Sequence, residues 1–208
     1  MGVAHGRSTH GVRGAVFASA ATLRLIAFRG NCHERSKLLK TKQMTTDAIL
    51  SAMCAVLGLI SLDFGNLKIS FESLPIIIGA LLFGPLDGFA IGAIGTLSYQ
   101  LLRYGVSITT ALWILPYALC GLVVGAYSMK NNFELSQKKL CFIVVVSELM
   151  VMLLNTVVMY IDSKVYGYYT FAYIFGTFVI RMVICIAKAF VFSAVVPLLL
   201  RPIKKALR

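Results

Sequence analysis

Residues 139–161 read KLCFIVVVSELMVMLLNTVVMYI, and after Lys139 this stretch contains a single charged residue, Glu148. A helix needs about 20 predominantly apolar residues to cross the hydrocarbon core of a bilayer, which is about 30 Å thick. The stretch meets this requirement in both length and composition. It predicts a transmembrane helix over 139–161 and places the chain among membrane proteins.

The composition of the whole chain extends this conclusion. Of the 208 residues, 59% are hydrophobic and only 13% are charged, whereas soluble domains are roughly half apolar and one quarter charged. The other apolar runs are separated by turn residues such as Phe83-Gly84-Pro85. We therefore predict an all-α integral membrane protein with six transmembrane helices, over residues 46–62, 74–83, 88–102, 109–129, 139–161 and 169–200.

Basic residues are unevenly divided between the two sides that these spans define. One side holds Lys37, Lys40, Lys42, Lys130, Lys138, Lys139, Arg201, Lys204, Lys205 and Arg208, and the other holds Lys68, Arg103 and Lys164. Because cytoplasmic loops are enriched in lysine and arginine, we predict that both termini are cytoplasmic. The same placement explains the excess of 20 Lys and Arg over 8 Asp and Glu without a nucleic-acid partner.

Residues 1–43 differ in composition from the rest of the chain. They are polar, carry arginines and all three histidines, and contain no acidic residue before Glu34. Such a composition is typical of a disordered or dispensable extension. The expected organisation is this basic extension followed by a membrane domain over 44–208.

Polar and aromatic side chains gather at the predicted outer ends of the helices, where they are candidates for binding a small molecule. Arginines pair with carboxylates, and aromatic rings stack on planar groups. The candidate substrate-binding residues are Phe71, Arg103, Trp113, Tyr117, Asn155 and Arg181. The alternative is that these rings and cations simply mark the membrane interface, although apolar residues flank Arg181 on both sides.

Two charged residues lie deeper in the predicted spans. At 1.5 Å per residue, Glu148 lies about 14 Å above Lys139 and Lys188 about 20 Å above Arg201. If their helices are neighbours, the two side chains can meet. A structural ion pair is the first interpretation, since each charge alone is costly in hydrocarbon, and a proton or ion relay is the second.

The first predicted helix carries a stripe of small residues, Ala48, Ser51, Ala52 and Ala55. Small residues four apart let two helices approach closely. Ala48, Ala52 and Ala55 are therefore candidate partner-binding residues, and packing within the chain is the alternative.

Motifs of enzymes are missing from the sequence. It contains no Walker A motif, no His-Glu-x-x-His and no Gly-x-Ser-x-Gly, so we predict neither catalytic residues nor ATP use by this chain. The five cysteines lack metal-ligand spacing, which indicates neither a metal site nor a disulfide framework. An autonomous ion-coupled secondary carrier, a membrane enzyme and a structural membrane subunit remain alternative functions.

Residues 67–88 include the turn Leu-Phe-Gly-Pro-x-x-Gly over 82–88, between the second and third predicted helices. This turn, the Ala-x-x-x-Ala face of the first helix and the six-helix layout resemble the substrate-binding S component of energy-coupling-factor (ECF) vitamin transporters. The resemblance covers roughly residues 44–205. It implies a multi-pass protein of a bacterial cell membrane that captures a vitamin at its extracellular face, under the loop after the first helix. It also implies partners, namely a transmembrane coupling subunit that contacts the first helix and two ATPase subunits that use ATP.

The resemblance suggests two candidate vitamins, folate and riboflavin. Leu154-Asn155-Thr156 and the pattern from Phe178 through Arg181 to Pro197 are most similar to the folate members, whereas residues 78–85 also look like riboflavin members. Residues 104–110 depart from the Phe-Pro-Gly-Phe-Thr stretch that folate members usually carry. Folate is the first expectation and riboflavin the second.

Overall fold

The computed structural model of the protein describes residues 40–64 and 67–207. The chain divides into two compact units, Met1–Met44 and Thr45–Arg208. The predicted extension over 1–43 lies almost entirely outside the described residues. The account below concerns the second unit.

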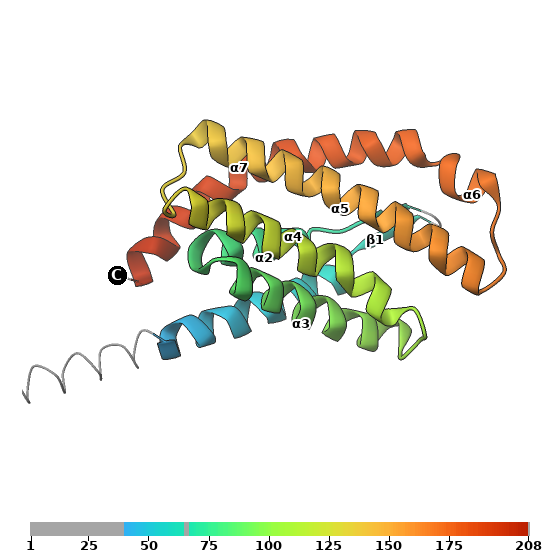
Figure 1. The fold of residues 1–208 in the computed structure, drawn as a ribbon, viewed down its shortest axis with the longest axis horizontal. Helices are drawn as coiled ribbons and strands as arrows, with labels where there is room; N and C mark the ends of the chain where they lie inside the picture. Colours follow the sequence, from blue (N-terminus) through green and yellow to red (C-terminus); the bar gives the residue numbers. More distant parts are fainter. Residues whose placement is uncertain (1–39, 65–66, 208) are drawn as a thin grey trace, which may run out of the picture. The chain divides into compact units, whose positions relative to one another are not determined.

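This unit is a bundle of helices with one small hairpin of strands (Figure 1). Its first helix ends at residue 59. The other elements are β1 (Leu62–Phe64), β2 (Leu67–Ile69), α2 (Ser73–Phe83), α3 (Pro85–Tyr104), α4 (Thr110–Lys130), α5 (Gln137–Val165), α6 (Phe171–Phe175) and α7 (Phe178–Leu207).

The structure contains helix at all six segments predicted from the sequence, with boundaries that differ by a few residues. Two features differ from the prediction. The connection after the first helix holds the antiparallel pair β1–β2, which makes the fold all-α apart from one short hairpin. The sixth segment is divided into α6 and α7 at Gly176 and Thr177, and glycine weakens a helix by about 1 kcal/mol relative to alanine.

Length and composition support a membrane protein. Among the described residues, three helical segments are long and apolar enough to cross a bilayer: Thr110–Lys130, Gln137–Val165 and Phe171–Ile203. Helix α2 is also apolar but shorter. The outward side of α7 exposes Val179, Val183, Ile186 and Phe190, each at 60% or more. Apolar surface of this extent is unfavourable in water and fits a face that contacts lipid tails.

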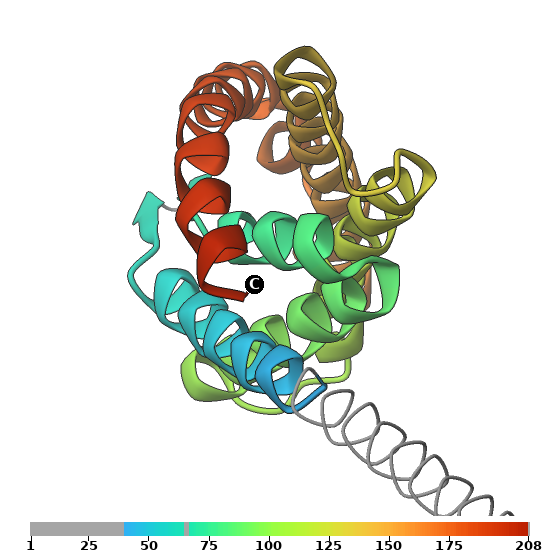
Figure 2. The same cartoon turned by 90° about the vertical axis from the view of Figure 1, so that its left-hand side faces the viewer.

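Helix α2 lies in the middle of the bundle, where it contacts α3, α4 and α7 (Figure 2). Its residues Ile76, Ile77, Ile78, Ala80 and Leu81 are at most 2% exposed. A helix that is hydrophobic all round is stable only where apolar neighbours surround it. Protein therefore covers most of this short helix, which accounts for its having fewer residues than a bilayer-spanning helix needs.

Glycines bring α3 and α4 into direct backbone contact. A Cβ atom added to Gly121 would lie 2.0 Å from the carbonyl oxygen of Gly88, and one added to Gly92 would lie 2.6 Å from that of Tyr117. Only glycine permits so close an approach. The contact sets the position of the first half of α4, which carries Trp113 and Tyr117.

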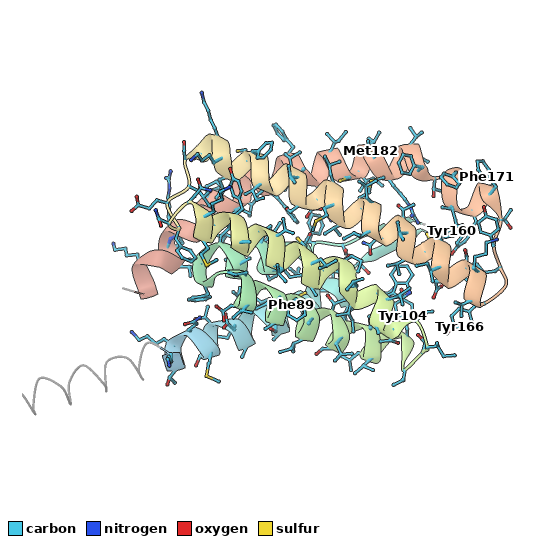
Figure 3. The ribbon with its side chains drawn as sticks, viewed as in Figure 1. Phe89, Tyr104, Tyr160, Tyr166, Phe171 and Met182 are labelled. Atoms are coloured by element: carbon cyan, nitrogen blue, oxygen red, sulfur yellow. The ribbon has the colours of Figure 1, made fainter. Side chains whose placement is uncertain are left out.

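The connections of the bundle separate into two groups (Figure 1). The α3–α4 and α5–α6 connections lie at one end of the unit, and the α4–α5 connection lies at the other, together with the last turn of α7. Figure 3 shows Tyr104, Tyr160, Tyr166 and Phe171 at the first of these ends, which we call the aromatic end.

Candidate functional site

A cavity of about 440 Å³ lies within the bundle, toward the aromatic end. This volume is in the range of pockets that enclose small organic ligands, about 300 to 1,000 Å³. Its wall combines apolar side chains with aromatic, hydroxyl and charged ones. The cavity is therefore the candidate functional site.

Helices α5 and α7 form one side of the cavity because each turns a single face toward it. From α5 come Glu148, Val151, Met152, Asn155, Met159 and Asp162, and from α7 come Arg181, Ile184, Cys185 and Lys188. Both sets follow the three- and four-residue spacing of one helix face. At 1.5 Å per residue, the α5 set extends about 21 Å along the helix.

The opposite side is built from α3, α4 and the connections at the aromatic end. It consists of Ser70, Tyr99, Gln100, Tyr104, Ser107, Thr109, Trp113 and Tyr117. Beyond the end of α5, Tyr166, Tyr168 and Tyr173 complete the wall. Ser70 belongs to the connection after the first helix, so this connection contributes to the cavity.

Four of the six residues selected from the sequence line the cavity: Trp113, Tyr117, Asn155 and Arg181. Tyr117 is buried, and Glu72, Ser70 and Asn155 surround its hydroxyl. The side-chain oxygen of Asn155 is buried and accepts no hydrogen bond in the described part of the chain. Buried polar atoms are normally hydrogen-bonded, so a ligand donor would satisfy this oxygen.

The Arg181 guanidinium lies at the cavity wall, where its Nη2 contacts the Met159 sulfur at 2.8 Å. Arg181 therefore presents a cation to the same space as the rings of Trp113 and Tyr117.

The structure does not bring the other two selected residues into the cavity wall. Phe71 packs against Phe192, with 6.0 Å between ring centroids, and is 41% exposed. Arg103 donates from Nη1 to the Leu59 carbonyl oxygen at 3.1 Å and to Ser61 Oγ at 3.2 Å. Leu59 is the last residue of the first helix, so Arg103 caps that helix and holds it to α3.

Glu148 and Lys188 form the ion pair whose geometry the sequence anticipated, with 3.0 Å between Nζ and Oε2. Ser73 donates to the other carboxylate oxygen of Glu148 at 2.6 Å and ties the pair to α2. Both charged side chains also line the cavity. The pair thus closes the end of the cavity that lies farthest from the aromatic end.

Asp162 is the main cavity residue that the sequence analysis did not select. Its side chain is only 8% exposed and accepts hydrogen bonds from the Tyr168 hydroxyl and, at 3.4 Å, from Trp113 Nε1. Burial and the bond to Asp162 raise the pKa of Tyr168 well above its usual value, since both oppose ionisation of the phenol. Tyr168 therefore stays a donor to the carboxylate at all physiological pH values.

A signal for Asp162 was present in the sequence. Glu148, Asn155 and Asp162 are spaced seven residues apart, which places them on one face of a helix. Asp162 follows the last apolar residue of the predicted span, where a charged residue normally marks the return to water, so its position in the sequence does not single it out. The aromatic residues that enclose it come from a connection, whose path the helical pattern does not predict.

The small residues of the first helix are divided by the fold. Ala55 is buried, and its neighbours Ser51 and Cys54 lie against Gly95 of α3. Ala48 and Ala52 are exposed, next to the exposed apolar residues Ile49, Met53 and Val56. Packing within the chain therefore accounts for Ala55 and leaves Ala48 and Ala52 on an outward face.

Cys54, Cys120, Cys141 and Cys185 are free thiols. In the described part of the chain, no group of three His, Cys, Asp or Glu side chains is arranged to hold a metal ion.

The fold and the cavity define a class of protein, a helical membrane protein with an internal cavity large enough for a small molecule. Comparison with known proteins gives the family. The model of the family "ECF transporter, substrate-specific component" matches residues 42–202. The chain belongs to this family, which comprises transport components rather than enzymes.

The chain is also similar to a curated protein, a UPF0397 protein of Lactobacillus johnsonii (strain CNCM I-12250 / La1 / NCC 533). The two are 35% identical over 69 residues, which is 33% of this chain and 35% of the relative. The match thus spans about a third of the relative's length. Family membership agrees with the long apolar helices in indicating a membrane protein.

Proposed function

We propose that this chain captures a water-soluble, vitamin-type molecule in the cavity and delivers it to the cytoplasm with its partner subunits. The observation that carries the proposal is the cavity itself, whose rings, hydroxyls and charges lie inside an otherwise apolar bundle. Polar residues inside a membrane protein are costly and mark binding or transport pathways. ATP is used by the partner ATPase subunits in this proposal.

Folate is the first candidate ligand. It combines a flat ring system with two carboxylates, and the cavity offers the rings of Trp113 and Tyr117 together with the Arg181 cation. Riboflavin is the second candidate, since its flat ring system suits the same aromatic residues.

The proposed topology has six membrane spans, with both termini in the cytoplasm and the aromatic end facing outward. In its support, Lys130 and Lys139 flank the α4–α5 connection, which lies at the same end of the unit as the last turn of α7. Basic residues concentrate on the cytoplasmic side. In intact cells, a membrane-impermeant thiol reagent should label Ser107→Cys but not Asn132→Cys in a cysteine-free background. The opposite labelling pattern would reverse the orientation.

The test of the function uses the full chain, purified in a mild detergent. Co-purifying small molecules are identified by mass spectrometry, and folate and riboflavin are then titrated while tryptophan fluorescence is recorded. Trp113 is the only tryptophan and lines the cavity, so the signal reports on this site. We expect saturable quenching by one vitamin. A protein that carries and binds no such compound would disprove the proposal.

A further inference from the structure

Two carboxylates line the cavity among the described residues, and their surroundings differ. Glu148 is neutralised by Lys188 at 3.0 Å, and Ser73 occupies its second oxygen. Asp162 accepts hydrogen bonds from two neutral donors, the Tyr168 hydroxyl and the Trp113 indole, and the contact to the indole is long at 3.4 Å. Asp162 is therefore the carboxylate with acceptor capacity to offer a ligand.

Aromatic side chains surround Asp162 in the cavity wall. Trp113, Tyr166, Tyr168 and Tyr173 all contribute to the cavity wall near the end of α5. The rings of Tyr168 and Tyr173 meet edge to face, with centroids 5.4 Å apart. An aromatic ligand stacked among these residues would present its edge, rather than its face, to the carboxylate.

An ionised carboxylate accepts hydrogen bonds and donates none. Its two oxygens provide about four acceptor sites, of which Tyr168 and Trp113 use two. A ring edge with two adjacent N–H donors can bind both oxygens at once. A ring edge that presents one N–H between two carbonyl oxygens cannot bind both carboxylate oxygens in this way. Its own oxygens would face the negative charge of the carboxylate.

We propose that Asp162 determines ligand specificity by selecting a heteroaromatic ring with two adjacent N–H donors. A 2-amino-4-oxopyrimidine edge, such as that of a pterin, has this pattern. The inference rests on the proposed function and favours folate over riboflavin. The dioxo edge of a flavin presents one N–H donor between two carbonyl acceptors, which is the pattern that a carboxylate does not bind. Arg181 lines the same cavity, where it can contact an anionic substituent of the ligand.

A matched pair of ring compounds tests the proposal. Pterin carries an amino group at the position where lumazine carries a carbonyl, and the two are otherwise alike. Their affinities for the full chain in detergent are measured by isothermal titration calorimetry, together with those of folate and riboflavin. Because charge-assisted hydrogen bonds are the strong ones, we expect pterin to bind roughly ten- to a hundredfold more tightly than lumazine.

The variant Asp162→Asn replaces one acceptor by a donor and removes the charge. Pterin affinity should fall roughly ten- to a hundredfold, and lumazine affinity should stay equal or rise, because an amide pairs with an N–H and a carbonyl. Glu134→Gln removes the same charge from an exposed residue outside the cavity wall and should change neither affinity.

Each outcome separates this inference from the proposed function. If the wild-type protein binds a vitamin but prefers lumazine to pterin, or binds both equally, the role of Asp162 is disproved while vitamin capture stands. The same conclusion follows if Asp162→Asn leaves the preference unchanged. If the wild-type protein binds none of the compounds and carries no vitamin, both proposals fall. If Asp162→Asn does not fold, a wild-type protein that prefers lumazine or binds both compounds equally still disproves the role of Asp162, and Asp162→Glu, which keeps the charge, should keep the preference for pterin if the role is correct.

Discussion

At the scale of single residues, two arginines illustrate how the fold separates similar side chains. Arg103 and Arg181 were both selected from the sequence as cations that could meet a ligand carboxylate. In the structure, Arg103 holds the carbonyl of Leu59 at the end of the first helix, whereas Arg181 lines the cavity. The two arginines are therefore expected to serve different purposes, helix capping and ligand binding.

Substitution of each arginine by alanine should separate these purposes. For an anionic ligand, Arg181→Ala should weaken binding roughly ten- to a hundredfold, because a charged hydrogen bond is worth about 1.5–3 kcal/mol. Arg103→Ala should lower the melting temperature and leave affinity nearly unchanged. Calorimetric titration and thermal unfolding in detergent measure the two effects. Equal loss of affinity in both variants would contradict this assignment.

The pair of Glu148 and Lys188 also belongs to this scale. Removal of one partner leaves a buried charge uncompensated, which costs about 3–5 kcal/mol. We therefore expect Lys188→Met to destabilise the protein strongly and Glu148→Gln with Lys188→Met to restore most of the loss. Thermal unfolding of the single and double variants measures this recovery.

The role of the pair follows from the same double variant. If it keeps the fold, the ligand affinity and uptake, the pair is structural, as first interpreted. A stable double variant that binds the ligand but no longer supports uptake would instead favour the relay.

At the scale of elements, close helix contacts decide where the cavity walls lie. Glycines allow α3 and α4 to touch along their backbones, and α4 carries Trp113 and Tyr117 to the cavity. On the other side, α5 and α7 each present one face of regularly spaced residues. The site thus depends on helix packing distances as much as on the residues that line it.

Gly121→Ala should disturb this packing. The added Cβ would lie 2.0 Å from the backbone oxygen of Gly88, so the helices must separate. Overpacking of this kind typically costs about 1–3 kcal/mol, and ligand affinity should fall with stability because Trp113 and Tyr117 move. Leu122→Ala, at an exposed neighbouring position, is the control and should change little. Thermal unfolding and titration check both variants, and a fully stable Gly121→Ala protein would contradict the packing argument.

At the scale of the whole molecule, we propose that this chain is one component of a larger assembly. The proposed partners are the ECF coupling and ATPase subunits named above. The first helix exposes Ala48 and Ala52 on its outward face, while Ala55 faces the interior. The exposed pair is the part of the stripe that a second protein can reach.

A tryptophan at each position distinguishes contact with a partner from internal packing. Ala52→Trp should leave ligand binding intact and abolish uptake in cells that contain the coupling and ATPase subunits, because the bulky ring blocks helix contact. Ala55→Trp should instead destabilise the isolated protein and weaken binding. Calorimetric titration, uptake of labelled vitamin and co-purification of the partners measure these effects. Normal uptake by Ala52→Trp would exclude this face from the interface.

The sequence by itself determined the class of the protein and the location of its helices. Apolar runs such as 139–161 are long enough to cross a bilayer, and this physical requirement is local to each segment. The same local reasoning found four residues of the cavity wall and anticipated the pair of Glu148 and Lys188, since polar groups stand out in apolar helices.

Only the tertiary structure decided which of the polar residues share one cavity. Arg181 reaches the cavity and Arg103 meets the end of the first helix because of the way the helices pack. The surroundings of Asp162 depend on the α5–α6 connection, which brings the Tyr168 hydroxyl to the Asp162 carboxylate. Helical periodicity predicts the face on which a residue lies but not the neighbour that this face meets, and that neighbour is set by the packing of elements far apart in the sequence.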